Sequence, residues 1–159
     1  MVEVASMRNG IHSGPLQASL PGAAIFNSVC AEQPTFSPLV AYAIKVNETG
    51  DDLSPNVESG DGGKGWMQLT SSYPDNWDVP EANVRYAVRE FLIPAETFWA
   101  AEGLEGDDLV RAIAAEYNAG RGGAEAGHEQ GDIGKFTTDH YSDRCLQHYQ
   151  LLEAGLSPF

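Results

Sequence analysis

The stretch SPLVAYAIKVNET, residues 37–49, decides the fold that the sequence predicts. Ser37 belongs to the residue types favoured at a helix N-cap, and Pro38 suits the first helical position. Apolar side chains then recur at helical spacing on one stripe and on the stripe beside it: Leu39, Ala43 and Val46, with Val40 and Ile44. Gly50 is a typical stop signal. The stretch therefore predicts a largely buried helix with Glu48 at its C-terminal end.

The residues before this helix predict a different kind of structure. Glycine and proline interrupt any long helical or strand period in the first 34 residues. We interpret residues 1–34 as an irregular arm that contains one short helix near Ala23–Cys30. Residues 35–159 would then form the main domain.

The residues after the helix begin with a loop and continue with further helices. The run GDGGKG at 60–65 cannot hold a regular helix, so residues 51–66 should form a loop or a small, poorly formed sheet. Three helices should follow. The first runs from Pro80 to Trp99 with a kink or break at Pro94. The second is capped by Asp107 or Asp108 and ends near Gly120; the third is capped by Thr137 or Thr138 and has Tyr141, Cys145 and Tyr149 on one face.

These elements predict a mostly α fold of the α+β kind. We expect a helical bundle around a buried central helix, with the small β or loop excursion after that helix forming one wall of a cleft. A length of 159 residues fits one such domain.

The charge balance narrows the range of partners. The chain carries 23 acidic and 9 basic residues, a formal net charge of −14. Nucleic acid and anionic membrane would repel such a surface, so we expect neither as a partner. No apolar run is long enough to span a bilayer. The first residues also lack the basic and apolar regions of a secretory signal peptide.

The cysteines and histidines do not predict a metal site. Cys30 and Cys145 are too few and too far apart in the sequence for a zinc site, and the four histidines show no ligand spacing. The two cysteines could form a disulfide, or each could be a small buried hydrophobic residue. We therefore expect no metal and no other cofactor.

Three short motifs occur in a defined order along the chain. They are AIKVNET at 43–49, GWMQL at 65–69 and AAEYNAG at 114–120. Their order resembles the superfamily of goose-type lysozymes and lytic transglycosylases, which shows Glu-Ser at a helix end, then Gly-Leu-Met-Gln, then Ala-Tyr-Asn-Ala-Gly. Thr49 replaces the serine here, and Trp66 replaces the leucine. The stretches DIG at 132–134 and TTDHYSD at 137–143 look like the goose-type C-terminal region.

The resemblance covers residues 35–152 and implies a lysozyme-like catalytic domain over residues 35–159. Such a domain would cleave the β-1,4 bond between N-acetylmuramic acid and N-acetylglucosamine in peptidoglycan glycan strands. We expect a monomer that acts on the bacterial cell wall, with a phage-encoded lysin as the simplest source. The acidic surface works against this expectation, because an anionic wall would repel it at low salt.

Glu48 is the residue on which this chemistry would depend. Cleavage of a glycosidic bond needs a proton at the leaving oxygen, and a carboxyl group supplies it near neutral pH only if its pKa is raised. Partial burial and the negative end of the helix dipole would both raise the pKa of Glu48. The alternative is that Glu48 is one solvated acid among many.

The resemblance also assigns substrate-binding roles around Glu48. It implies that Gln68 hydrogen-bonds the substrate, that Met67 packs near Glu48, and that Tyr117 and Asn118 flank the cleft. The Tyr117 hydroxyl could orient Glu48, and Tyr141 would have a similar role. For Met67 and both tyrosines the alternative is ordinary packing in the core.

The remaining choice is between hydrolysis and ring closure. An inverting hydrolase needs a second carboxylate to activate water, whereas a lytic transglycosylase uses the 6-hydroxyl of muramic acid. Asp61 matches a goose-type aspartate, although the loop after it is two residues shorter, while Thr70 stands where the family has another. Asp51 and Asp52 are fallback candidates. We expect hydrolysis with Asp61 as the base; the alternatives are a lytic transglycosylase and a non-catalytic wall-binding or virion structural module.

Overall fold

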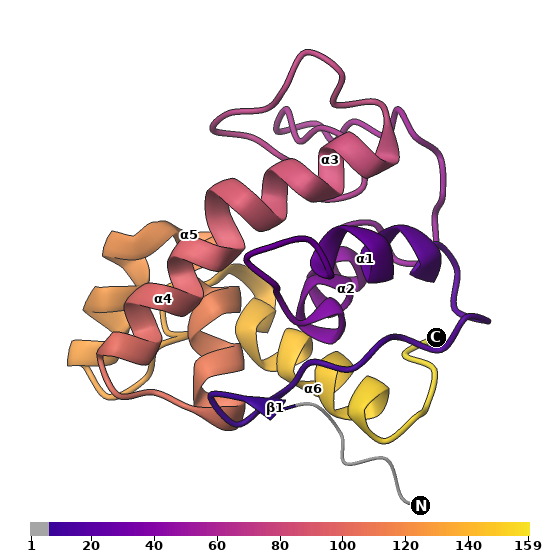
Figure 1. The fold of residues 1–159 in the computed structure, drawn as a ribbon. Helices are drawn as coiled ribbons and strands as arrows, with labels where there is room; N and C mark the ends of the chain where they lie inside the picture. The colour runs from indigo at the N-terminus through magenta and orange to yellow at the C-terminus, as the bar shows by residue number, and fades with distance from the viewer. Residues whose placement is uncertain (1–6) are drawn as a thin grey trace, which may run out of the picture.

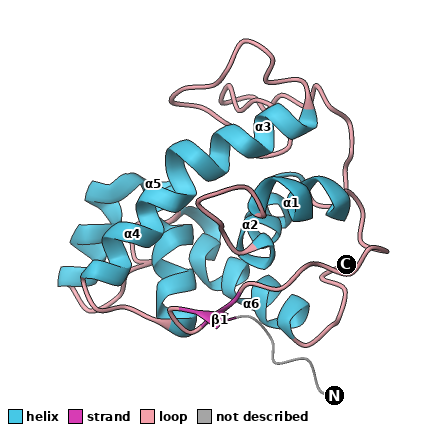
Figure 2. Ribbon diagram, viewed as in Figure 1, coloured by secondary structure: helices cyan, strands magenta, loops and turns pink. Residues whose placement is uncertain are grey.

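The computed structural model describes residues 7–159 and is mostly helical, with one short antiparallel hairpin (Figures 1 and 2). The mostly α fold class is therefore confirmed. Its elements are β1 (Met7–Arg8), β2 (Ile11–His12), α1 (Ala23–Cys30), α2 (Pro38–Thr49), α3 (Pro80–Ala87), a π-helical turn (Val88–Leu92), α4 (Ile93–Ala101), α5 (Gly106–Glu129), a 3-10 turn (Thr138–His140) and α6 (Tyr141–Glu153).

Helix α2 lies inside the molecule, as predicted. The Ser37 side chain accepts a hydrogen bond from the Val40 amide at 3.3 Å, so the predicted N-cap is confirmed. Every residue from Pro38 to Lys45 is buried. The helix packs against α1 and α6, and α6 in turn packs against α5. It ends at Gly50, whose φ of +58° suits a residue without a side chain.

Helices α3 and α4 form one long rod that spans the molecule in Figure 1. The predicted interruption at Pro94 takes the form of a π-helical turn just before it, in which the Ile93 amide donates to the Val88 carbonyl. A proline cannot donate to the residue four positions earlier and clashes with its carbonyl. The wider turn removes that conflict, so the rod continues to Ala101.

Helix α5 differs from its predicted bounds at both ends. It begins at Gly106 after Glu105, so Asp107 and Asp108 lie in its first turn and do not cap it. The backbone at Gly120 has φ 75° and ψ 166°, which breaks the helical path near the predicted end, and a further helical segment then extends to Glu129.

The start of the last helix also differs from the prediction. Neither Thr137 nor Thr138 caps it; Thr137 precedes a 3-10 turn, and α6 begins only after His140, which has a left-handed backbone. The predicted inner face is confirmed, because Tyr141, Cys145 and Tyr149 are all buried.

The described part of the N-terminal arm packs onto the same core as the helices. Ile11, Leu16 and Leu20 are buried in it, and α1 has the predicted bounds. The guanidinium of Arg8 donates to both carboxylate oxygens of Glu96 in α4, at 2.9 and 2.7 Å. Residues 7–34 therefore stabilise the helical domain and are continuous with it.

The segment between α2 and α3 is the predicted loop. Isolated bridges join Lys64 to Glu58 and to Leu69, and no regular strand forms between residues 50 and 79. Among residues 7–159, no helix combines the length and hydropathy that a membrane span requires.

Both cysteines are buried free thiols, which decides between the two alternatives left open by the sequence. Burial raises the pKa of Cys30 to about 12, and it raises that of Cys145 as well. Both side chains therefore behave as small hydrophobic residues of the core.

We predict that a thiol-specific reagent modifies neither cysteine in the folded protein and both after unfolding in guanidinium chloride, because only unfolding exposes the thiols and lets them ionise. Quantitative thiol titration under the two conditions measures this. An absence of titratable thiols after unfolding would indicate a disulfide and contradict the structure.

Candidate active site

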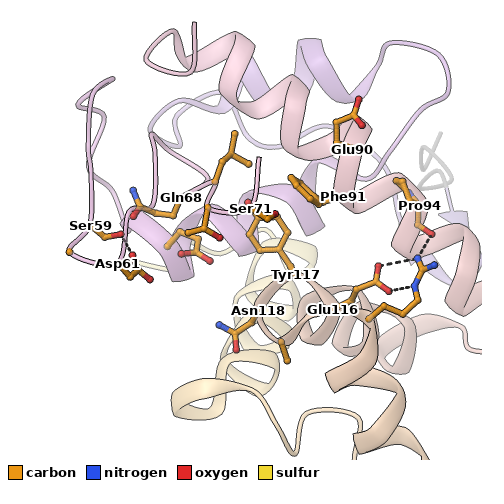
Figure 3. Close-up of a pocket in the computed structure, with 17 residues that line it drawn as sticks. Ser59, Asp61, Gln68, Ser71, Glu90, Phe91, Pro94, Glu116, Tyr117 and Asn118 are labelled. Carbon is orange, nitrogen blue, oxygen red and sulfur yellow. Dashed lines mark hydrogen bonds and ion pairs between the residues drawn. The ribbon is translucent and has the colours of Figure 1, made fainter. Parts of the chain in front are cut away.

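One large cleft opens along the face where α2 ends. It has a volume of about 860 Å³, and its walls come from the loop after α2, from the α3–α4 rod and from α5 (Figure 3). The residues that line it are Glu48, Ser59, Gly60, Asp61, Gln68, Leu69, Thr70, Ser71, Glu90, Phe91, Pro94, Glu116, Tyr117, Asn118, Ala119, Gly120 and Arg121. The three sequence motifs thus meet at one cavity.

Glu48 reaches this cleft from the last turn of α2 and is partly buried. Burial raises the pKa of its carboxyl group to about 7. The hydrogen bond from Tyr141 opposes that shift, the negative charge of Asp61 adds to it, and Arg144 opposes it weakly. Desolvation dominates, so the carboxyl group is protonated in a large fraction of molecules at neutral pH.

Tyr141 holds the Glu48 carboxyl group. Its hydroxyl donates to Glu48 Oε1 at 2.6 Å, and its own burial raises its pKa, so the hydroxyl stays protonated. The Asn47 side chain donates to the Tyr141 carbonyl at 2.9 Å. Two successive residues of α2 therefore bind the first residue of α6, which places the tyrosine ring beside the acid.

Tyr117 does not have the orienting role that we considered for it. It lines the cleft, but its hydroxyl donates to the Met67 carbonyl at 2.5 Å, so Tyr141 orients Glu48 instead. Its ring meets that of Phe91 edge to face, with 6.2 Å between centroids. These two rings form an aromatic wall of the cleft.

Met67 and Gln68 are neighbours in the second motif but differ in burial. The Met67 side chain is fully buried in the core and is not among the residues that line the cleft. The structure therefore places Met67 as a packing residue and not as a substrate contact. Gln68 lines the cleft, has φ +49°, and donates to the Gly65 carbonyl at 2.8 Å.

Asp61 lines the same cleft and is exposed. Its carboxylate accepts hydrogen bonds from the Ser59 hydroxyl and from the Gly63 amide, and these lower its pKa. Glu48 and Asp61 therefore line one cavity, and their environments shift their pKa values in opposite directions.

Asn118 lines the cleft and also links two helices. Its Oδ1 accepts from the Thr138 amide at 2.9 Å, and its Nδ2 donates to the Thr138 hydroxyl at 3.2 Å. These bonds tie α5 to the 3-10 turn before α6. Asn118 therefore supports the position of Tyr141 as well as lining the cavity.

Lys45 is a buried lysine in the middle of α2 that sequence reasoning missed. Its ammonium group donates to the carbonyls of Gly50 at 2.8 Å and Asp52 at 2.6 Å, and it lies 5.3 Å from the centre of the Trp66 ring. Burial lowers its pKa to about 8. Lys45 thus binds the chain just after Glu48 and fixes how it leaves α2.

Asn83 is the second residue that the sequence did not reveal. It is buried at the start of α3, accepts from the Met67 amide at 2.9 Å, and donates to the carbonyls of Lys64 and Trp77 at 3.0 Å each. Gly65 has φ +69°, and a Cβ there would lie 2.3 Å from Asn83 Nδ2. The second motif is therefore clamped against α3, and only glycine fits at position 65.

No cluster of three or more histidine, cysteine, aspartate or glutamate side chains that could hold a metal ion occurs within residues 7–159. Comparison with known proteins finds no matching family model, no matching curated protein and no matching solved structure. Inferences about function therefore depend on the cleft and on the three motifs.

We predict that Asn83→Ala lowers the free energy of unfolding by about 2–4 kcal/mol, because it removes three hydrogen bonds and leaves a buried amide without a partner. Chemical denaturation measures this. Asn56→Ala, at an exposed asparagine of the same loop, should change stability by less than about 0.5 kcal/mol. Equal stabilities of the two variants would show that the hydrogen bonds of Asn83 do not stabilise the fold.

Proposed function

We propose that the protein cleaves peptidoglycan glycan strands between N-acetylmuramic acid and N-acetylglucosamine, with Glu48 as the general acid. The observation that carries this proposal is the Glu48 carboxyl group, partly buried at a large cleft and with its pKa raised to about 7. The resemblance of the three motifs to goose-type lysozymes and lytic transglycosylases supplies the substrate class.

Glu48 can both deliver a proton and tolerate its loss. Near pH 7 about half of the molecules carry the proton, which is the state that donates to the glycosidic oxygen. Once the proton has left, the carboxylate accepts the hydrogen bond from Tyr141, which stabilises the negative charge. The same contact holds the carboxyl group in position before the reaction.

Asp61 suits the role of the base that activates water. An aspartate is ionised near neutral pH, hydrogen bonds lower the pKa of Asp61 further, and this residue lines the cleft that contains Glu48. An inverting hydrolase needs such a carboxylate on the face of the sugar opposite the acid. This favours hydrolysis over ring closure by the muramic acid 6-hydroxyl, for which no second carboxylate is needed.

The lining of the cleft is suited to a polysaccharide. Gln68 and Ser71 offer polar groups, while Phe91 and Tyr117 offer aromatic surface on which a sugar ring can pack. A non-catalytic wall-binding or virion structural module would also need such contacts, but it would have no use for a carboxyl group held protonated near neutral pH.

We predict that Glu48→Gln lowers the rate of glycan-strand cleavage by at least about 10²-fold, because the amide cannot donate the proton. Turbidity loss of purified sacculi, with circular dichroism as the fold check, measures this. Glu129→Gln, an exposed acid outside the cleft, should leave the rate unchanged. Full activity in a folded Glu48→Gln protein would refute the assignment.

Product analysis tests the role of Asp61. The wild-type protein should release fragments with reducing ends, and Asp61→Asn should lose at least about 10²-fold in rate because water is no longer activated. Mass spectrometry distinguishes reducing ends from 1,6-anhydro ends. Anhydro products from the wild type, or undiminished hydrolysis by Asp61→Asn, would assign the reaction to transglycosylation or to another base.

The pH dependence follows from the sign of the Glu48 shift. Activity requires the protonated acid, so it should fall as the pH rises through about 7. In Tyr141→Phe the hydrogen bond that lowers the Glu48 pKa is lost, and the alkaline limb of kcat/KM should move to higher pH while the maximal rate drops. A limb that stays in place, or that moves to lower pH, would contradict the role of Tyr141.

A further inference from the structure

Arg121 is the one cationic residue among the described residues that line the cleft. The acids Glu48, Asp61, Glu90 and Glu116 line the same cavity. A neutral sugar chain needs no cation for its recognition, whereas among the described lining residues only Arg121 carries a charge that attracts an anionic part of a ligand. The position of Arg121 therefore restricts where an anionic group of the substrate can lie.

Several contacts hold the Arg121 side chain, but part of its guanidinium remains without a partner among the described residues. Its Nε donates to Glu116 Oε1 at 2.6 Å, its Nη2 reaches Glu116 Oε2 at 3.3 Å and the Pro94 carbonyl at 3.5 Å, and its guanidinium lies 4.2 Å from the centre of the Phe98 ring. The side chain is 42% exposed, and its Nη1 makes no hydrogen bond to the described residues. The ion pair orients the guanidinium, and the free edge can bind a second anion.

The location of Arg121 follows from the break in α5. Gly120, the last residue of the third motif, has φ 75° and interrupts the helix immediately before Arg121. In Figure 3 its partners Glu116 and Pro94 lie at the end of the cleft away from Ser59 and Asp61. The cation therefore lies apart from the proposed base, toward the end of the cleft bounded by the α3–α4 rod.

We infer that Arg121 binds a carboxylate of the peptide stem that branches from the glycan strand, and that it is a specificity-determining residue. This inference rests on the proposed function and names the part of the substrate that the cleft selects. The stem peptides of peptidoglycan carry free carboxylates, whereas the lactyl carboxyl of a stem-bearing muramic acid is consumed in an amide bond. The paired edge of the guanidinium is taken by Glu116, and the free Nη1 can donate charge-assisted hydrogen bonds to such a carboxylate.

The test uses two forms of one soluble substrate. Glycan strands that carry stem peptides are compared with the same strands after their carboxyl groups have been coupled to methylamine, which removes the charge and retains the peptide. We expect the wild-type protein to prefer the charged strands by about five- to tenfold in kcat/KM, the size of one partly exposed charge-assisted contact.

Arg121→Gln should lose this preference by losing activity on the charged strands alone, and Arg121→Lys should retain an intermediate preference because it keeps the charge without the planar fork. The matched control is Arg111→Gln, which also removes one positive charge but lies outside the cleft, paired with Asp132 and Asp143. It should keep the wild-type preference.

Three results would overturn the inference. The wild type could cleave both strands equally, Arg121→Gln could slow both equally with a lowered melting temperature, or Arg111→Gln could lose the preference as well. The second result would assign Arg121 a structural role through Glu116, and the third would indicate an effect of net charge. A wild-type protein that cleaves neither strand would refute the proposed function itself, and the inference with it.

Discussion

The partial burial of the Glu48 carboxyl group, at the C-terminal end of α2, is the constraint on which the rest of the site depends. Its pKa of about 7 comes mainly from desolvation, and desolvation requires α6 to pack against α2 at that point. The Tyr141 hydroxyl then donates a hydrogen bond of 2.6 Å to the acid. The packing of α6 against α2 therefore accounts for the raised pKa of Glu48 on which the proposed function depends.

A buried acid costs stability, and the sign of the cost depends on pH. Above pH 4.5 the carboxyl group of the unfolded chain ionises, while the folded carboxyl of Glu48 keeps its proton until about pH 7. The unfolded state thus binds fewer protons in this window, and the folded state loses up to about 3 kcal/mol as the pH rises through it. The hydrogen bonds of Lys45 and Asn83 stabilise the loop next to Glu48 and so offset part of this loss of stability.

Local sequence patterns predicted which helix carries Glu48. Contacts between segments distant in the sequence determine which side chains surround it. Helical periodicity and an N-cap were enough to place Glu48 at the end of a buried helix. Nothing in the sequence distinguishes Tyr117 from Tyr141 as the partner of Glu48, because the choice depends on how α5 and α6 pack. Lys45 was missed because a lysine pattern predicts exposure, and its acceptors are carbonyls of a turn. Pro94 predicted an interruption but not the π-helical turn that absorbs it.

The raised pKa of Glu48 is tested most directly by NMR titration of its carboxyl carbon, with Glu48→Gln used to assign the resonance. We predict a midpoint near pH 7, shifted upward when Tyr141 is replaced by phenylalanine. A midpoint close to the ordinary value of about 4.5 would show that the carboxyl group is solvated and ionised at neutral pH. That result would contradict the proposed role of Glu48 as the proton donor.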